Sequence, residues 1–204
     1  MHPEETLMQE LKPQTKQIHI IKRSGKKAPL NIDKIHFVVD QACEGITGVS
    51  SSQIEMNSDL QFTDGMTTQD IQDILIRSAN DLISLDTPNY QYAAARLLLW
   101  GVRKDVFNRF QTIPLTELID KNIELGVYDE GIIKKYTKEE LKKLNTWIKH
   151  DRDLNFTYAG LRQVVDKYLV QDRSTGGLYE TPQDMYMMIA ATLFAEYPVK
   201  SRMG

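Results

Sequence analysis

The most suggestive chemistry in the sequence is a basic turn followed directly by a predicted helix start. The turn surrounds Gly25, whose missing side chain allows a ligand to approach the backbone closely. A helix is predicted to begin at Asn31, where free amide groups and the positive dipole end attract an anion. Lys34 lies in the first turn of that helix, an unfavourable place for a cation unless an anion lies nearby. Four cations belong to the turn itself: Lys22, Arg23, Lys26 and Lys27. The pattern is typical of a phosphate site, although from composition alone a solvated basic turn is the simpler alternative.

The rest of the sequence carries no comparable arrangement of reactive side chains. No segment matches the motifs of a serine hydrolase, a P-loop or a zinc protease. Cys43 is the only cysteine, which excludes an internal disulfide, a zinc ribbon or a dithiol pair. It falls in an apolar helical series, so we expect a buried, inert thiol. The four histidines lack the spacing of metal ligands: His2, His19, His36 and His150. We therefore predict no catalytic residue, no metal site and no intrinsic cofactor.

A dense run of charges follows one of the predicted helices, at His150-Asp151-Arg152-Asp153. Such a run suits either a solvated loop that caps the helix or an ion-pair cluster with a functional role. The solvated loop is the simpler expectation.

The composition is that of an ordinary globular protein with room for one large domain or two small ones. The chain has 204 residues, of which 41% are hydrophobic and 26% charged, and a net charge of −3. The acidic balance argues against a nucleic-acid-binding surface, and no apolar run is long enough to cross a membrane. Residues 1–16 lack the apolar core of a secretory signal. We expect a cytoplasmic protein whose residues 1–16 form a flexible leader.

Residues 17–110 are predicted to form a short β-hairpin followed by four helices. The hairpin places the basic turn between two short extended segments, 19–21 and 28–30. The helix that starts at Asn31 and the third helix each carry one apolar face at helical spacing. The four helix starts are marked by Asn31, by capping boxes at Ser52-x-x-Glu55 and Thr67-x-x-Asp70, and by Thr87-Pro88 with proline at the first helical position.

Residues 111–204 are predicted to be helical with one small hairpin. Helices are expected at 114–126, 137–149 and 157–168, and a hairpin between 168 and 180. A final helix, 185–197, is apolar almost all round. We expect it to be buried on most of its sides and to need further protein against which to pack.

These segments, in this order, resemble the N-terminal portion of the class I ribonucleotide reductase large subunit, in its bacterial and phage form. Lys22-Arg23-Ser24-Gly25 followed by Asn31-x-Asp33-Lys34-Ile35 looks like the start of an ATP-cone, a regulatory nucleotide-binding module. Further matching motifs, spread over residues 18–199, are Asp64-Gly65-Met66-Thr67-Thr68-x-Asp70-Ile71, Pro88-x-Tyr90-Gln91-Tyr92-x-Ala94-Ala95-Arg96-Leu97, Gly126-x-Tyr128-Asp129, His150-Asp151-Arg152-Asp153-x-x-Phe156-x-Tyr158, Lys167-Tyr168-Leu169-Val170 and Tyr179-Glu180-Thr181-Pro182-Gln183.

The resemblance implies a mainly α fold in two parts. Residues 17–110 would be the ATP-cone, with its short β-hairpin cap on a four-helix unit. Residues 111–204 would be the helical lead-in, with its small hairpin, to a catalytic barrel that this chain does not contain.

The resemblance also implies that the cone binds ATP as an activator, or dATP as an inhibitor, of reduction elsewhere in the enzyme, with Mg²⁺ as a companion of the nucleotide. By matching position, Lys22 and Lys104 would contact the phosphates and Thr68 the base or sugar. Asn31 and Ile35 would meet the nucleoside end. The predicted site as a whole comprises Lys22, Arg23, Ala28, Pro29, Leu30, Asn31, Ile32, Asp33, Lys34, Ile35, Thr68 and Lys104. Its agreement with the anion site favours a bound nucleotide over a solvated turn.

Three positions depart from the family pattern. Ala28 stands where the family often has glutamate, and Gln72 and Gly101 stand where it often has histidine. Each lost hydrogen bond would weaken nucleotide binding by about 0.5–1.5 kcal/mol. Inhibition by dATP is the property that these departures put in question.

The resemblance does not extend to the family's ten-stranded barrel, which carries the radical cysteine and the redox cysteine pair. Cys43 is not at a position that matches any of these cysteines. We therefore predict an allosteric part of a ribonucleoside-diphosphate reductase that supports deoxyribonucleotide synthesis without catalysing it alone. Its partners would be the remaining catalytic part of the large subunit and the radical-bearing small (β) subunit, in the cytoplasm of a cell or of a phage host. No nucleic acid or membrane is expected to bind. The alternative is a stand-alone nucleotide sensor or reductase-docking module with no catalytic role. A cone-bearing transcription regulator would need zinc-ribbon cysteines and a basic face, which the sequence lacks.

Overall fold

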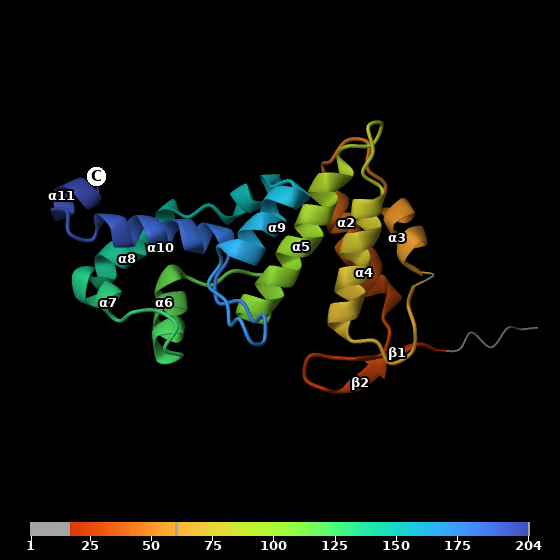
Figure 1. The fold of residues 1–204 in the computed structure, drawn as a ribbon, viewed down its shortest axis with the longest axis horizontal. Coiled ribbons are helices and arrows are strands. Elements are labelled where there is room, and N and C mark those ends of the chain that lie inside the picture. Colours follow the sequence, from red (N-terminus) through yellow and green to blue (C-terminus); the bar gives the residue numbers. More distant parts are fainter. Residues whose placement is uncertain (1–16, 60, 204) are drawn as a thin grey trace, which may run out of the picture.

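The computed structural model describes residues 17–59 and 61–203. The predicted leader, residues 1–16, lies outside the described residues. The molecule is mainly helical and elongated, with residues 17–107 towards one end and residues 115–147 and 182–202 towards the other (Figure 1).

The predicted β-hairpin is confirmed at the N-terminal end of the described chain. Strand β1 (His19–Ile21) pairs antiparallel with β2 (Lys27–Pro29). Gly25 closes the turn at a φ of 77°, a left-handed conformation that favours glycine. The Ile21 amide also donates to the Met66 carbonyl at 2.8 Å, just ahead of the third helix. The hairpin is therefore fixed against the start of that helix.

The four helices predicted after the hairpin are present. They are α2 (Ile32–Cys43), α3 (Ser51–Asp59), α4 (Thr68–Asp81) and α5 (Tyr90–Phe107). Two predicted caps form as expected. The Asn31 side chain accepts a hydrogen bond from the Lys34 amide at 2.8 Å, and Thr67 and Asp70 make a reciprocal capping box.

Two of the helix starts differ from the prediction. Helix α3 begins at Ser51, so Ser52 lies inside the helix, where it cannot cap it. Its expected partner Glu55 instead pairs with His36 of α2, at 2.7 Å between Oε1 and Nδ1. Helix α5 begins at Tyr90, so Pro88 precedes the helix and does not occupy its first position. At α3, the ion pair of Glu55 with His36 replaces the capping interaction that the local sequence indicated.

Helix α5 is the centre of the larger core. Helices α2 and α4 pack on it, and so do α9 (Tyr158–Lys167) and the 3-10 helix η1 (His150–Asn155). Its buried side chains come from every turn: Tyr90, Ala93, Ala94, Ala95, Leu97, Leu98, Leu99, Val102 and Val106. Because α5 is covered on several sides, any displacement of it acts on helices from both halves of the chain.

The second half contains the four predicted helices, the last of which, α10 (Pro182–Phe194), begins at Pro182 rather than at residue 185, and three short ones that the sequence did not predict. Helices α6 (Leu115–Glu124), α8 (Lys138–Trp147) and α9 correspond to predictions, and Thr137 and Glu140 form the expected capping box of α8. The unpredicted elements are α7 (Gly131–Lys135), η1 and α11 (Val199–Arg202). A smaller core joins α6, α7 and α8 to the end of α10 through residues that include Leu115, Ile119, Leu141, Leu144 and Ala191.

The hairpin predicted between residues 168 and 180 is reduced to one isolated antiparallel bridge, between Gln171 and Leu178. The Tyr179 amide donates to the Val170 carbonyl at 3.1 Å, but the Val170 amide donates to the Glu180 side chain at 2.9 Å. The buried carboxylate of Glu180 thus takes the place of a backbone acceptor, and the ladder does not extend.

Helix α10 is not buried on most of its sides, and that prediction is wrong. Only part of the helix is covered, because the described residues supply neighbours for one side of it (Figure 1). Its exposed apolar residues recur at helical spacing and define what we call the α10 face: Tyr186, Ile189, Leu193 and Phe194, which are 45%, 50%, 69% and 48% exposed. None of the described helices is both long enough and apolar enough to span a bilayer.

Candidate functional site

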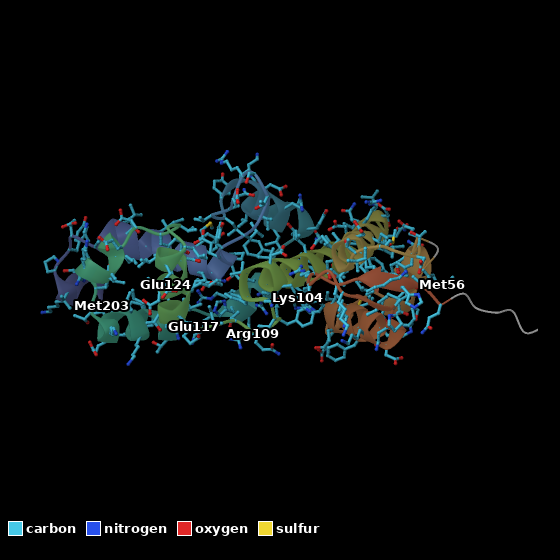
Figure 2. All side chains as sticks on the ribbon, turned by 90° about the horizontal axis from the view of Figure 1, so that it is seen from below. Met56, Lys104, Arg109, Glu117, Glu124 and Met203 are labelled. Carbon is cyan, nitrogen blue, oxygen red and sulfur yellow. The ribbon has the colours of Figure 1, made fainter. Side chains whose placement is uncertain are left out.

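Four chain segments meet at the hairpin end of the first four helices: the basic turn, the starts of α2 and α4, and the last turns of α5. The packing of α5 fixes this arrangement. Arg96 Nη1 donates to the Ala42 carbonyl near the end of α2, at 3.3 Å, and Gln72 Nε2 of α4 donates to the Leu97 carbonyl at 2.7 Å. Since α2 runs antiparallel to α5, about two further turns of α5 bring Lys104 to the level of the α2 start. Figure 2 labels Lys104 on α5.

Lys104 is the most confined cation of this region. Its side chain is half-buried, and its ammonium lies 4.3 Å from the centre of the Phe110 ring. Burial lowers the pKa of Lys104, and the neighbouring charges of Arg23 and Lys34 lower it further. Cations from the hairpin, α2 and α5 therefore repel one another here. We call Arg23, Lys34 and Lys104 the cation cluster, and an anion placed among them would relieve the repulsion.

Arg23 is the cation of the basic turn that the fold directs towards α5. Its Nη2 lies 2.8 Å from Asp105 Oδ1, and it donates to Gln69 Oε1 of α4 at 3.1 Å. Burial raises the pKa of Asp105, whereas the charge of Arg23 lowers it. The ion pair anchors the turn on α5 and compensates part of the charge of Arg23.

The lysines of the predicted site have no carboxylate partner in the described part of the chain. Within residues 17–59 and 61–203, no Asp or Glu lies within ion-pair distance of Lys22, Lys34 or Lys104. Lys22 and Lys34 are exposed, and Lys22 is not among the charges that shift the pKa of Lys104. The structure thus brings Arg23, Lys34 and Lys104 together and leaves Lys22 outside this cluster.

The other predicted residues lie on the hairpin and at the helix starts. Ala28, Leu30 and Thr68 are half-buried, Ile35 is buried, and the rest are exposed: Pro29, Asn31, Ile32 and Asp33. Two cavities, of about 450 and 280 Å³, are lined by other residues, the first beside α7, α8 and α11 and the second along α4. The described residues include no group of three or more side chains suited to holding a metal ion.

Gln72 of α4 and Gly101 of α5 face each other where the two helices pack. A Cβ atom added at Gly101 would lie 3.6 Å from Gln72 Cγ. Gln72 therefore occupies the space above Gly101, and its amide nitrogen is committed to the Leu97 carbonyl of α5. This pair joins α4 to α5 beside the cation cluster.

A second group of charged residues lies where α5 meets η1, at the run for which a solvated loop was the simpler expectation and an ion-pair cluster the alternative. The run His150–Asp153 begins η1: Asp151 and Arg152 are exposed, but Asp153 is only 1% exposed. Arg103 Nη2 donates to the His150 carbonyl at 3.2 Å, and Gln183 Nε2 of α10 donates to Asp153 Oδ1 at 2.9 Å. For Asp153 the simpler expectation failed because it treated the run in isolation, without the donors that α5 and α10 bring to it. The sequence signal for this group was Arg103, which follows a long apolar stretch of α5 and lies seven residues after Arg96.

This α5–η1 junction (Arg103, His150, Asp153, Gln183 and Asp184) holds buried polar atoms that lack a partner among the described residues. They are Arg103 Nε, His150 Nδ1, Asp153 Oδ2 and Asp184 Oδ1. Burial raises the pKa of Asp153 to about 6 and lowers the pKa of His150 to about 4, and the charge of Arg103 lowers both. Burial therefore disfavours the charged form of each group.

Replacing His150 with glutamine is expected to remove part of the acid sensitivity of the fold. The pKa of His150 in the folded chain, about 4, lies below its ordinary value of 6.5. The neutral form is favoured by folding, so its contribution to stability is present above pH 6.5 and is lost as the pH falls towards 4. Between pH 7 and pH 5 the loss amounts to about 1–2 kcal/mol.

Urea denaturation at the two pH values measures this difference. The raised pKa of Asp153 acts in the opposite direction over the same range, but it is present in both proteins and cancels in the comparison. An equal change in the free energy of unfolding for wild type and variant would contradict the assignment.

Two family models match the chain. The ATP cone domain matches residues 18–105, which contain the hairpin, α2, α3, α4 and all but the last two residues of α5, Lys104 included. The ribonucleotide reductase all-alpha domain matches residues 154–203, from the end of η1 through α9 and α10 to α11.

Curated relatives match over most of the chain. Ribonucleoside-diphosphate reductase 1 subunit alpha of Salmonella typhimurium and that of Escherichia coli are each 46% identical to it over 184 residues, 90% of this chain and 24% of the relative. The corresponding subunit of Enterobacteria phage T4 is 41% identical over 182 residues, 89% of this chain and 24% of the relative. The chain spans about a quarter of the length of these relatives.

Proposed function

This chain belongs to the ribonucleotide reductase family, as the ATP-cone-bearing N-terminal region of an alpha subunit, and we propose that it binds ATP or dATP as an allosteric effector. The effector would control reduction of ribonucleoside diphosphates by other parts of the enzyme. We place the ATP-cone at residues 17–110 and the helical lead-in to the catalytic part at residues 111–204. The observation that carries the proposal is the half-buried position of Lys104, where the charges of Arg23 and Lys34 both act on it, near the start of α2.

The charges of the cation cluster suit a triphosphate. Folding lowers the pKa of Lys104 by burial and by two other cations, which is unfavourable unless a ligand compensates it. A triphosphate carries several negative charges, and the first amides of α2 add donors for its oxygens. Lys22 is exposed on the same turn and would reach the outer phosphates. Mg²⁺ would enter the site with the phosphates.

The nucleoside would lie along the hairpin and the helix starts. Residues 28–34 would line its pocket, with Asn31 and Ile35 at the nucleoside end and Thr68 at the base or sugar. Asn31 already accepts a hydrogen bond from the Lys34 amide, so its amide nitrogen is the group that would face the ligand. Ala28 offers the sugar no hydrogen bond, which favours effectors held mainly through their phosphates.

Two partners are proposed for the rest of the chain: the remaining catalytic part of the large subunit and the radical-bearing β subunit. The α10 face supports the first of these, because four large apolar residues on one helix face are costly to leave in water. The complementary part of the enzyme would cover this face. The alternative, a stand-alone sensor, would leave the α10 face permanently exposed, so this observation favours the reductase component.

Polar substitutions on the α10 face are expected to reduce the exposed apolar surface without weakening the fold. Ile189 and Leu193 are 50% and 69% exposed, so replacing both with glutamine should lower binding of an apolar fluorescent dye by roughly half. The unfolding temperature should stay the same. Leu85→Gln is the matched control, because Leu85 is fully exposed and lies away from the α10 face. Undiminished dye binding by the double variant would show that the face is already covered, for example by a second copy of the chain.

Isothermal titration calorimetry of the 204-residue chain tests the proposed function. We expect ATP and dATP to bind with one site per chain, and inorganic tripolyphosphate to bind more weakly at the same site and to compete with ATP. Adenosine should not bind measurably, because the phosphates provide most of the affinity. Absence of binding by ATP and dATP to a chain that is folded by circular dichroism would refute the proposal.

A further inference from the structure

The 3-10 helix η1 is held at both ends by two arginines of α5. Arg103 Nη2 donates to the carbonyl of His150, its first residue, at 3.2 Å. Arg96 Nε approaches the carbonyl of Leu154, near its other end, at 3.5 Å. The two arginines are seven residues apart, which places them about two turns apart on the same side of the helix. Helix η1 therefore lies along α5 and is attached to it at two points.

The same two arginines also connect η1 to the helices that carry Lys104 and Lys34 of the cation cluster. Arg103 is the residue next to Lys104, and a displacement of the last turn of α5 moves both side chains together. Arg96 Nη1 donates to the carbonyls of Ala42 and Glu44, at 3.3 and 2.6 Å, at the end of α2. The start of α2 carries Lys34, the second member of the cation cluster. Both helices that supply cations to the site are thus attached to η1.

On its other side η1 is joined to α10. Gln183 Nε2 donates to Asp153 Oδ1 at 2.9 Å. Asp184, on the same helix as Gln183, is fully buried, and the charge of Arg103 lowers its pKa. Asp153 and Asp184 each have one buried oxygen without a hydrogen-bond partner among the described residues. The buried Nε of Arg103 also lacks one. These atoms are complementary, donor and acceptors, yet unpaired. A small shift of η1 can therefore exchange one set of partners for another, which is the behaviour expected of a two-state element.

We propose that η1 is the relay through which occupancy of the cation cluster is communicated to α10, with Arg103 as the residue that positions it. The inference rests on the proposed function, since it requires an anionic effector at Lys104. A triphosphate bound there draws the end of α5 towards the ligand, and Arg103 transfers the movement to the His150 carbonyl. Gln183 then passes it from Asp153 to the start of α10, and so to the α10 face.

Hydrogen–deuterium exchange of the 204-residue chain, with and without ATP, tests the relay. We expect ATP to slow exchange in residues 22–35, and also in residues 150–155 and at the start of α10, by at least about fivefold. Calorimetry on the same samples establishes that ATP is bound. Bound ATP without any change in residues 150–155 would refute the relay and leave the proposed function intact, whereas absence of binding would end both.

Two variants locate the steps of the relay. Arg103→Lys keeps a cation beside Lys104 but removes the Nη2 and Nε donors. It should bind ATP with an affinity within roughly threefold of wild type and lose the ATP-dependent protection of both η1 and α10. Gln183→Leu removes the side-chain hydrogen bond between η1 and α10 and leaves the backbone contact of residue 183, so it should keep the response of η1 and lose most of that of α10. It also serves as the test if Arg103→Lys does not fold.

Arg162→Lys is the matched control, because Arg162 is exposed and pairs with Asp166 within α9. It should leave every response unchanged. A wild-type response in Arg103→Lys, or in the α10 segment of Gln183→Leu, would overturn the corresponding step.

Discussion

Replacing Lys104 with methionine is expected to weaken ATP binding by roughly 10- to 100-fold. A hydrogen bond between a charged donor and a phosphate contributes about 1.5–3 kcal/mol, and 1.4 kcal/mol corresponds to a tenfold change in affinity. Methionine retains an unbranched apolar side chain beside Phe110, whose ring centre lies 4.3 Å from the Lys104 ammonium. The pKa of Lys104 is lowered by burial and by the charges of Arg23 and Lys34, so its charged form is unfavourable in the folded chain. Methionine removes this charge, and the free energy of unfolding should therefore not fall. Calorimetric titration and urea denaturation measure the two quantities.

Lys26→Met is the matched control for this variant. It removes the same charge from the exposed end of the basic turn, and Lys26 is not among the groups that shift the pKa of Lys104. We expect less than about a twofold change in affinity. Lys22→Ala should weaken binding by an intermediate factor. Equal losses for Lys26→Met and Lys104→Met would mean that only the overall charge matters, and would contradict a specific phosphate contact.

Replacing Glu180 with alanine is expected to destabilise the fold by about 3 kcal/mol. The side chain of Glu180 is 2% exposed and accepts hydrogen bonds from the Tyr128 hydroxyl and, at 2.9 Å, from the Val170 amide. Alanine leaves both donors without an acceptor and opens a cavity. Burial raises the pKa of Glu180, which means that the ionised carboxylate is itself unfavourable, and this offsets part of the loss.

Glu180→Gln separates the hydrogen bonds from the charge. The amide keeps the size of the side chain and removes the buried charge. Its oxygen can accept from the Val170 amide and its nitrogen can donate to the Tyr128 hydroxyl, so the cost should be about 1 kcal/mol or less. Urea denaturation at pH 7 compares the two variants. A loss as large for glutamine as for alanine would show that the carboxylate charge, and not the acceptor, holds Tyr128 and Val170.

The features that could be predicted from the sequence are those determined by a few neighbouring residues. Asn31, the Thr67–Asp70 pair and the Thr137–Glu140 pair all start helices as predicted, because each cap is completed within three residues. The Ser52–Glu55 signal is of the same type and fails, since Glu55 is paired with His36 of another helix.

The features that could not be predicted depend on contacts between distant segments. The burial of Asp153 requires Gln183, 30 positions away, and no local pattern reports that contact. The apolar sequence along α10 indicates that the helix needs further protein against which to pack. It does not indicate which residues lack neighbours, so the position of the α10 face could not be predicted.

The candidate site shows the same division. Clustered cations and a helix start were visible in the sequence, whereas the orientation of the basic turn was not. Arg23, and not Lys22, is the cation of the turn whose charge acts on Lys104. Asp105 of α5 and Gln69 of α4 hold the Arg23 guanidinium in this orientation. Arg23 and Asp105 are far apart in the sequence, so no spacing pattern could indicate which cation of the turn pairs with α5.

The central claim is that Arg23, Lys34 and Lys104 converge on the phosphates of a nucleotide. An NMR titration of the Lys104 ammonium group, in the 204-residue chain with and without ATP, tests it most directly. The pKa of Lys104 should lie below that of an ordinary lysine in the free chain, because of burial and the two neighbouring cations, and should rise when ATP binds. An ordinary pKa in the free chain that saturating ATP leaves unchanged would contradict the claim.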